Sequence, residues 1–395
     1  MASDRQLRLH ITADALDRDP HPVFEAMQSA PPAVWVEDLG MWLVVGYKHV
    51  EAILRNTEDF VTGTPGSLIF DTFGEHMLTA EGAQHERFKS RFRGAFSPAR
   101  IRASMAQKVD ACSQMLLDGL SSGGKADFRK AYASRLPVLS ILSLFDMPLE
   151  EEPKLRLWYD GFERALSNFA WREDVRARAH GYVGEFHALV RRHIARVRAA
   201  PDDSLLSEVV NDESDDRLDD AEICRNASII FFGGISTVEA VILNCLYALC
   251  THPDALADVR RDLDLIPQAI EETLRWLSPV QSATRHVVRD LSLGESTFRA
   301  GDIVNCMIGA ANRDPRVFED PGAFRPCRTN VRKHLGFALG PHFCLGSNLA
   351  RLEAATAIRH ILERCPGLHL SADHPTEIRG FEFRQPTALH LEWRT

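Results

Sequence analysis

The sequence predicts a mainly α-helical fold with a small β portion, on two observations. From about Ser97 to Arg275, apolar residues recur mostly at helical spacing. After Arg275 the pattern changes to short alternating runs with glycine-marked turns, as in LSLGESTFRAGDIVNCMI. Two strand-like segments, PAVWV and MWLVVGY, precede the helical region. No repeat, low-complexity tract or linker divides the chain, so we expect residues 1–395 to form a single domain.

The longest predicted helix lies within LDDAEICRNASIIFFGGISTVEAVILNCLYALCTHPD. Asp219 can cap its first turn, and Glu222 occupies the reciprocal position of a capping box. About thirty residues at ~1.5 Å per residue give roughly 45–50 Å, enough to cross a whole domain. The middle of the segment is apolar on nearly every side, which predicts that the helix is buried.

The composition is that of a soluble protein. Lys and Arg total 46 and Asp and Glu 55, and the net charge of −9 argues against general nucleic-acid binding. The first residues contain no apolar core for a signal peptide, and we expect no membrane-spanning segment in the rest of the chain. The eight cysteines are scattered without a CxxC pair. We therefore expect reduced thiols, no zinc site and a cytoplasmic location.

One cysteine has an unusual setting, in the segment HLGFALGPHFCLGSNLAR. Gly340 and Gly346 flank Cys344, His342 lies two residues upstream, and a predicted helix begins just downstream, where the thiolate is favoured over the thiol. The glycines allow a flat ligand to approach the backbone, and Phe337 offers an aromatic face. Besides a buried structural cysteine, this setting suits a nucleophile with His342 as base, a redox sensor, or a metal ligand such as the axial ligand of a haem iron.

The same segment resembles the haem-binding loop of the cytochromes P450, which reads approximately Phe-Gly-x-Gly-x-His-x-Cys-x-Gly and is often followed by Leu-Ala-Arg. The matching residues are Phe337, Gly340, His342, Cys344, Gly346, Leu349, Ala350 and Arg351. Ala338 replaces the first glycine of the motif, so we expect a slightly altered turn. The resemblance covers nearly the whole chain.

Two further segments support the resemblance. EETLRW carries the family's Glu-x-x-Arg as Glu272 and Arg275, which can pair at i and i+3 on one helix. Arg328 in FRPCR matches the arginine that completes the family's buried Glu-Arg-Arg cluster. The role that the resemblance implies for this cluster is structural, on the side of the fold that holds the cysteine loop.

The resemblance implies a prism-shaped domain of the soluble bacterial class, with haem b between the long helix and the cysteine loop. Cys344 would be the axial iron ligand, and His342 would be part of the loop's scaffold. Residues that match the family's haem-propionate contacts are His85, Lys89, Arg285 and His334. Lys89 stands where the family has arginine, so we expect a single contact instead of a bidentate one.

On the oxygen side the family usually has Ala-Gly-x-Asp/Glu-Thr, and this chain has GGIST. The resemblance implies that Gly233 and Gly234 form the groove where dioxygen binds; tight helix packing is the alternative. Thr237 matches the threonine that helps to deliver protons. Ser236 stands in place of the usual acid and offers no carboxylate. Glu239 either supplies a substitute relay through water or is paired elsewhere.

Correspondence with the family places the substrate pocket among mostly aromatic residues. This predicts a small apolar or aromatic substrate, although several of these side chains suit a hydrophobic core equally well. The predicted lining is Phe70, Phe73, Phe162, Phe169, Phe232, Val280 and Phe383.

Electrons must come from outside, since the chain contains no flavin or iron–sulfur motif. Residues 85–102 contain six Arg or Lys and one acid, Glu86. A basic patch near the cysteine loop would steer an acidic ferredoxin, which receives its electrons from NAD(P)H through a reductase. An ordinary solvated helix face is the alternative.

The sequence thus predicts a haem-thiolate monooxygenase that uses O2 to hydroxylate, or to O- or N-dealkylate, a small organic molecule. Because the usual acid is missing, a peroxide-using or atypical haem-thiolate oxidase is one alternative. A non-catalytic haem or ligand-binding protein is another, and a cysteine hydrolase is a third.

Overall fold

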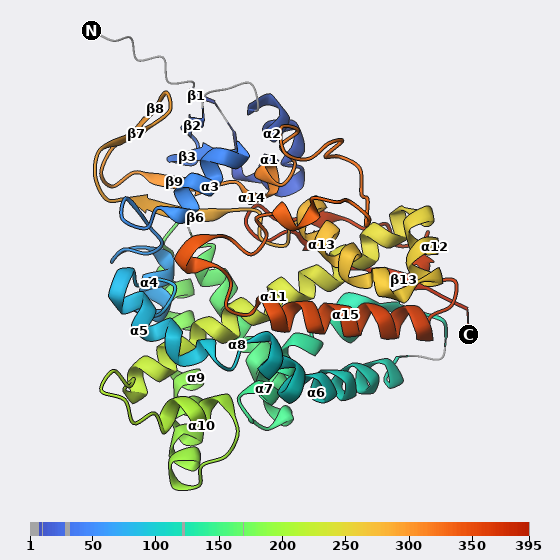
Figure 1. The fold of residues 1–395 in the computed structure, drawn as a ribbon, viewed down its shortest axis with the longest axis horizontal. Helices are drawn as coiled ribbons and strands as arrows, with labels where there is room; N and C mark the ends of the chain where they lie inside the picture. The colour runs from blue at the N-terminus through green and yellow to red at the C-terminus, as the bar shows by residue number, and fades with distance from the viewer. Residues whose placement is uncertain (1–7, 10, 28–31, 121–122, 169, 395) are drawn as a thin grey trace.

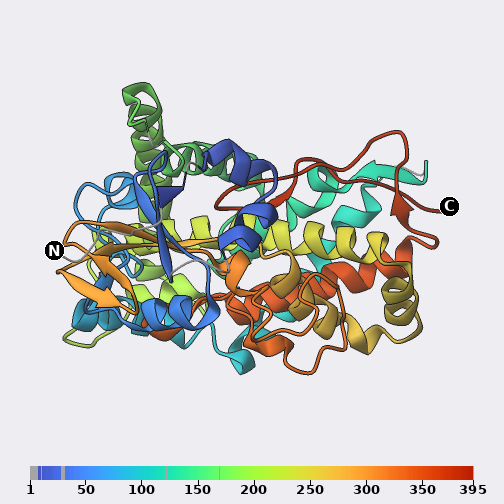
Figure 2. The same ribbon diagram turned by 90° about the horizontal axis from the view of Figure 1, so that it is seen from above.

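The computed structural model describes residues 8–9, 11–27, 32–120, 123–168 and 170–394. Helices make up most of the molecule; the six-stranded sheet lies where the N-terminal segments gather, while β13 of a smaller sheet lies on the opposite side, near the C-terminus (Figure 1). Seen from above, α11 (Asp220–Thr251) runs through the middle of the molecule (Figure 2). The predicted fold class, mainly α-helical with a small β portion, is confirmed.

Most helices lie between the N-terminal strands and the C-terminal hairpins. The α-helices are α1 (Ala13–Arg18), α2 (His21–Met27), α3 (Tyr47–Arg55), α4 (Leu68–Phe73), α5 (Gly82–Arg93), α6 (Pro98–Asp118), α7 (Leu136–Leu144), α8 (Glu152–Leu166), α9 (Glu173–Ala199), α10 (Leu205–Val210), α11, α12 (Pro253–Arg261), α13 (Ile266–Trp276), α14 (Ile308–Ala311) and α15 (Ser347–Arg364). Shorter helical turns cover Arg129–Ala133, Leu149–Glu151, Leu263–Leu265, Val331–Lys333 and Gly340–His342.

The strands are short. They are β1 (Arg8–Leu9), β2 (Ala33–Val36), β3 (Met41–Val44), β4 (Phe60–Val61), β5 (Lys125–Asp127), β6 (Ala283–Val287), β7 (Leu291–Leu293), β8 (Ser296–Phe298), β9 (Ile303–Cys306), β10 (His369–Leu370), β11 (Ile378–Arg379), β12 (Gln385–Pro386) and β13 (His390–Glu392). One sheet has the order β1-β2-β3-β9-β6-β4, and smaller ones are β10-β13-β5, β11-β12 and β7-β8.

Both faces of the six-stranded sheet are covered at β3. Trp42 and Val44 pack into a cluster on one face, whereas Met41 and Leu43 pack into a separate cluster on the other. Successive side chains of a strand point to opposite faces, so a strand that is buried on both sides reads as a continuous apolar run. This explains why MWLV shows no alternation of apolar and polar residues.

Helix α11 lies at the centre of the main core. The side chain of its N-cap, Asp219, accepts a hydrogen bond from the Glu222 backbone N–H (2.7 Å), and the Glu222 carboxylate accepts one from the Asp219 N–H (3.0 Å). The predicted capping box is therefore confirmed. Helices α7, α9, α13 and α15 pack against α11 and bury nearly all of its middle.

The expectation that no segment is long and apolar enough to span a membrane is wrong for α11. By length and composition this helix could cross a bilayer, with a mean hydropathy of 1.9 over its most apolar stretch. However, 83% of that stretch is buried inside the fold. Packing against other helices on all sides explains its composition.

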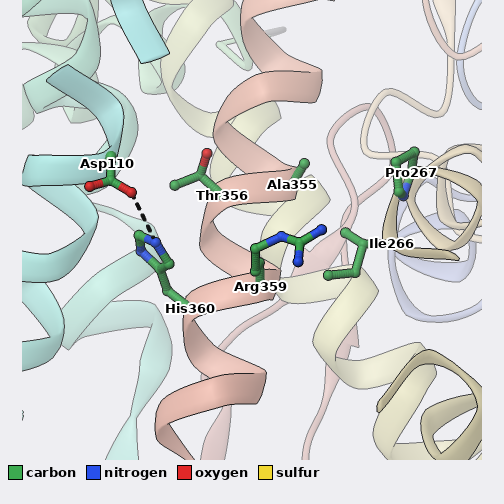
Figure 3. A pocket seen from close by; sticks show the side chains of 7 residues that line it. All are labelled: Asp110, Ile266, Pro267, Ala355, Thr356, Arg359 and His360. Atoms are coloured by element: carbon green, nitrogen blue, oxygen red, sulfur yellow. Dashed lines mark ion pairs between the residues drawn. The ribbon is translucent and has the colours of Figure 1, made fainter. Parts of the chain in front are cut away.

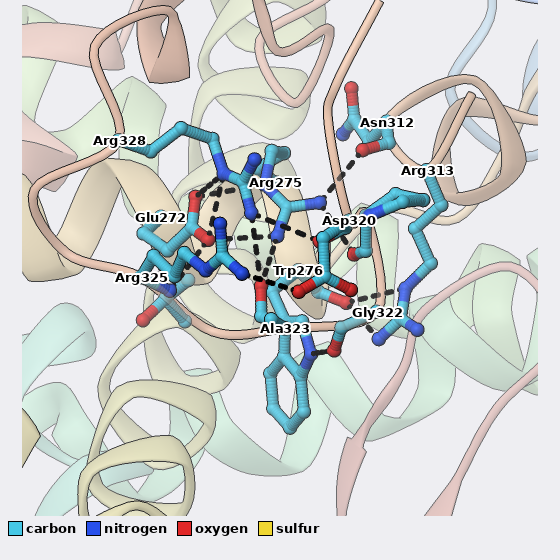
Figure 4. Close-up of polar contacts among 12 residues, drawn as sticks. Glu272, Arg275, Trp276, Asn312, Arg313, Asp320, Gly322, Ala323, Arg325 and Arg328 are labelled. Carbon is cyan, nitrogen blue, oxygen red and sulfur yellow. Dashed lines mark hydrogen bonds and ion pairs between the residues drawn. The ribbon is translucent and has the colours of Figure 1, made fainter. Parts of the chain in front are cut away.

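A buried ion cluster fastens α13 to the irregular segment that leads to the cysteine loop. Two nitrogens of Arg275 donate to the two carboxylate oxygens of Glu272, at 2.8 Å each, and Arg328 donates to the same carboxylate at 3.2 Å (Figure 4). Other donors of both arginines reach the backbone carbonyl of Ala323. The structure thus contains the expected Glu-Arg-Arg cluster, with Glu272 and Arg275 fully buried.

Replacing Glu272 by glutamine is expected to lower the free energy of unfolding by about 3–5 kcal/mol, because two buried guanidinium groups lose their counter-ion. Urea unfolding of the holoenzyme measures the change. Asp258→Asn is the matched control: Asp258 and Arg261 are also three residues apart on a helix but are exposed, so the loss there is at most about 1 kcal/mol. Equal losses in the two variants would contradict the prediction.

Candidate functional site

Cys344 lies between the turn Gly340–His342 and the first turn of α15. Its backbone N–H donates to the carbonyl of Phe337 (2.9 Å), which closes the loop. Burial raises the pKa of the thiol, and the backbone N–H groups of Gly346 and Ser347 oppose that shift. The N–H groups at the helix start thus favour the thiolate, while desolvation outweighs them and raises the net pKa in the free protein. A bound cation would reverse the balance.

The turn before the cysteine places Ala338 in a conformation that glycine adopts more easily. This residue has φ +56°, in the left-handed region that side chains with a Cβ rarely adopt. Gly340 has φ +70°, and a Cβ there would lie 3.0 Å from the carbonyl oxygen of Leu54 in α3. Gly340 thus serves the packing of the loop on α3, whereas a Cβ at Gly346 would meet only open space.

A cationic cluster lies beside the loop. His85 of α5 contacts the carbonyl of Pro341 through Nε2 (3.0 Å), and its ring packs edge-on against His342, with centroids 4.4 Å apart. Lys89, one turn along α5, donates to the carbonyls of Pro341 and Phe343. These contacts join α5 directly to the segment that holds Cys344.

In this cluster a guanidinium N–H and a histidine ring nitrogen have no partner within the described part of the chain. Arg285 is buried, and while its Nη1 donates to the Thr284 carbonyl (2.9 Å), its Nε donates to nothing. The Nδ1 of His342 is equally unpartnered, its Nε2 being bonded to Glu81 (2.7 Å). A buried guanidinium without an ion pair is costly unless an anion meets it. The residues present therefore fit a group that brings carboxylates to this side, as the propionates of a haem would.

His334 lies in a separate ion cluster, and its expected propionate contact stays a prediction. Its Nε2 is bonded to Glu271 (3.1 Å), and its Nδ1 accepts a hydrogen bond from the Gly336 N–H (3.1 Å). Arg351 donates to the same carboxylate of Glu271. In this structure both ring nitrogens of His334 are engaged with the protein. His342, which the sequence analysis assigned to the scaffold, occupies the position beside Arg285 and His85.

The two glycines of GGIST have different surroundings. A Cβ at Gly233 would meet nothing within 4 Å, while one at Gly234 would lie 2.8 Å from Cδ1 of Ile141 in α7. Thr237 lies one turn after Gly233 and donates from Oγ1 to its carbonyl (2.7 Å). Gly233 and Thr237 thus face an open space inside the molecule, and Gly234 serves tight helix packing.

Ser236 and Glu239 are engaged with other elements. The Ser236 hydroxyl accepts a hydrogen bond from the hydroxyl of Tyr159 in α8. The Glu239 carboxylate accepts one from Nε of Arg129 at 2.7 Å, so its alternative role, a carboxylate paired elsewhere, describes the structure. Burial raises the pKa of Glu239. The sequence did not predict the role of Tyr159, because no local pattern links it to Ser236, which is 77 positions away in the chain.

Most of the predicted pocket residues form one aromatic cluster. Phe73 packs edge-on against Phe162 (5.1 Å between centroids) and lies 5.8 Å from Phe232. Phe383 lies 6.1 Å from Phe232 and pairs by backbone with Val280. Phe70 is partly buried on α4 and makes no ring contact with the cluster, while Phe169 lies outside the described residues.

The cluster encloses little space of its own. A cavity of about 10 Å³ is lined by residues of α8, α9 and α11, among them Tyr159, Phe162 and Phe232. This is room for about one water molecule. The aromatic side chains therefore pack together, and the space next to Gly233 is the open one.

A larger cavity of about 170 Å³ lies between α6, α13 and α15 and contains none of the predicted site residues (Figure 3). In its wall Asp110 contacts His360 (3.1 Å), whose Nδ1 contacts the hydroxyl of Ser113 (2.8 Å). The order resembles a hydrolytic triad, but Ser113 is completely buried and shares its hydroxyl with Tyr132. No nucleophile of this triad faces the cavity.

Known proteins resemble this chain along its length. A model of the family Cytochrome P450 matches residues 166–388. The monooxygenase PikC of Streptomyces venezuelae is 33% identical over 95% of this chain and 91% of its own length, and the 6-deoxyerythronolide B hydroxylase of Saccharopolyspora erythraea is 31% identical over 92% and 93%. The crystal structure of CalO2 superposes with a TM-score of 0.89 at 28% identity, covering 97% of this chain and 98% of that one.

The site and the fold define a protein with a partly buried thiol, an adjacent buried guanidinium and an open stretch on a central helix. With the similarities above, the chain belongs to the cytochrome P450 family. It is accordingly a monooxygenase, an oxidoreductase of a family that uses haem and O2.

Replacing Ala338 by glycine is expected to raise the free energy of unfolding by about 0.5–1 kcal/mol, because glycine adopts φ +56° without the steric cost that alanine has. Urea unfolding monitored by circular dichroism measures it. Ala355→Gly in α15 is the control with opposite sign, and should lower the stability by about 1 kcal/mol. A loss of stability in Ala338→Gly would show that the turn does not depend on the left-handed conformation.

Proposed function

We propose that this enzyme hydroxylates, or removes an O- or N-alkyl group from, a small organic molecule, with haem b held by Cys344 as axial ligand. The observation that carries the proposal is the buried, unpaired Arg285 beside His342, next to the loop that presents the thiol. A thiolate suits a metal, and unpaired buried cations suit carboxylates. Haem b combines the two requirements in one ligand.

When bound, the haem supplies an iron centre that binds and reduces dioxygen and oxidises a C–H bond. The chain's own residues would hold the haem and fix the loop that binds it. Cys344 would ligate the iron, Arg285 and His342 would bind propionate, and His85 and Lys89 would fix the loop through its carbonyls. Phe337 stacks under the guanidinium of Arg351 (4.3 Å to the centroid), which holds that ring in place.

Hydroxyl groups of this chain would supply the protons that the reaction with dioxygen needs. Thr237 holds its Oγ1 at the open stretch, where the hydroxyl can accept a proton as well as donate one. Ser236 accepts from Tyr159, which leaves the Ser236 proton free to be passed on. Glu239 is bound to Arg129 (2.7 Å), so we assign the proton-handling role to the hydroxyls of Thr237 and Ser236 and not to this carboxylate.

We propose an acidic ferredoxin as electron donor, supplied from NAD(P)H by a reductase. Arg87 and Arg91 of the basic stretch are bound to Glu222 (2.7 Å) and Asp212 (2.9 Å), so they are not available for docking. Arg93 is bound to Glu86 (2.7 Å), but both side chains are exposed. Phe343 in the cysteine loop is exposed, and Lys89 donates to its carbonyl (2.8 Å). An exposed apolar side chain next to a basic one suits an acidic partner with an apolar centre.

We also propose that residues 1–395 act as one domain in the cytoplasm. Helix α11 contacts elements from α4 near the N-terminus to β12 near the C-terminus. Because these contacts join distant segments of the chain to one helix, the chain does not divide into independent domains. All eight cysteines are free thiols, as a reducing compartment favours.

Three other functions are the alternatives to this proposal. Ser236 in place of an acid favours peroxide as the oxidant, because peroxide needs no delivered protons. A non-catalytic haem protein would share the thiol and cation cluster but form no product. A cysteine hydrolase would be colourless as purified.

Cys344→Ser is expected to abolish the thiolate-type spectrum of the reduced protein with carbon monoxide, together with product formation, because the axial sulfur is lost. Absorption spectroscopy of the purified proteins measures this. Cys327→Ser, at an exposed cysteine, is the control and should leave the spectrum as in the wild type. An unchanged spectrum in Cys344→Ser would refute the axial assignment.

Thr237→Ala is expected to lower the product formed per NAD(P)H consumed at least about 10-fold with ferredoxin and reductase, because the hydroxyl that handles protons is lost. With hydrogen peroxide the same variant should retain its yield. Thr237→Ser keeps the hydroxyl and serves as the control. Equal effects of the substitution under the two conditions would favour the peroxide-using alternative. The same holds if the wild-type enzyme forms product with peroxide but not with ferredoxin and reductase.

A further inference from the structure

Glu382 occupies a fixed position at the tip of the hairpin between β11 and β12. The Gln281 N–H donates to the carbonyl of Glu382 (2.8 Å). Gly380 has φ +123°, and a Cβ there would collide with the carbonyl oxygen of Phe383 at 1.7 Å, so this tight turn requires glycine. The tip is therefore held against the segment that carries Val280.

The residue that follows Glu382 in the sequence belongs to the aromatic cluster. Phe383, the next residue, pairs with Val280 and places its ring 6.1 Å from that of Phe232 on α11. Phe232 precedes Gly233, where the helix faces open space. The backbone of Glu382 is thus held beside an apolar lining, and its side chain is partly exposed.

This carboxylate has no protein partner within the described part of the chain. No hydrogen bond or ion pair reaches its side chain, which is only partly exposed. The nearest cation in the sequence, Arg384, donates to the backbone carbonyls of Asp17, Arg18 and Gly380. Burial raises the pKa of Glu382 to about 7, with no charged group acting on it. A carboxylate in such surroundings gains most from a cation brought by a ligand.

We propose that Glu382 binds a cationic nitrogen of the substrate, so that the enzyme acts on hydrophobic ammonium compounds. The inference rests on the proposed function for the location of the substrate. The ring faces of Phe232 and Phe383 add to the attraction for a cation. A neutral molecule of the same shape leaves the carboxylate unpaired, and the site therefore discriminates between the two by charge.

The test uses two probes of equal shape, benzyltrimethylammonium and its carbon analogue neopentylbenzene. The quaternary nitrogen has no lone pair, so it cannot ligate the haem iron. Calorimetric titration of the holoenzyme gives both dissociation constants. We expect the cation to bind at least about 10-fold more tightly than the neutral probe, and Glu382→Gln to weaken the cation at least about 10-fold while changing the neutral probe less than about 2-fold.

Glu377→Gln is the matched control, because Glu377 lies on the same hairpin but is exposed and bound to Arg379; it should change neither constant. Glu382→Gln should also unfold at the wild-type temperature or above it, since no partner is lost, and Glu382→Leu repeats the test if the amide perturbs folding.

Equal loss for both probes, no loss for the cation, or the same loss in Glu377→Gln would overturn the inference. The haem-thiolate assignment is read independently from the carbon monoxide spectrum, and survives each of these outcomes.

Discussion

The burial of α11 on nearly all sides is the constraint on which the rest of the structure depends. A 32-residue helix that is apolar all round needs neighbours on every face, and α7, α9, α13 and α15 supply them. Within the fully described stretch 226–246, burial is interrupted at Gly233, Gly234 and Thr237 alone. Protein interiors pack as densely as organic crystals, so an opening in the middle of such a helix marks a place for a ligand. Packing thus indicates the site independently of any motif.

The two sides of that site carry unpaired groups of opposite charge. Arg275 is a buried cation with partners: the Glu272 carboxylate neutralises its charge, and backbone carbonyls accept hydrogen bonds from its other N–H groups. Arg285 is buried without such a partner, and Glu382 is a carboxylate without a cation. Buried charges of this kind are costly in the free protein. An anionic cofactor on one side and a cationic substrate on the other would satisfy both.

The sequence predicts best what is local or strongly patterned. The capping box at Asp219 and the pair of Glu272 with Arg275 follow from spacings of three residues on a helix, and both are present. Spacing alone does not tell which histidine lies beside Arg285, because a loop intervenes. His334 and His342 are separated by turns with positive φ, one at Ala338, and spacing does not give the direction of a side chain beyond such turns. The structure was needed to show which histidine joins Arg285.

Contacts across helices lay beyond the sequence altogether. Ser236 and Tyr159 are 77 residues apart, and their contact depends on how α8 settles on α11. The ring of Tyr159 also stacks on Phe232 at 5.5 Å, and Phe162, one turn further along α8, packs on Phe73. One helix therefore carries both the hydroxyl that meets Ser236 and a wall of the aromatic cluster. A displacement of this wall would therefore also displace the partner of Ser236.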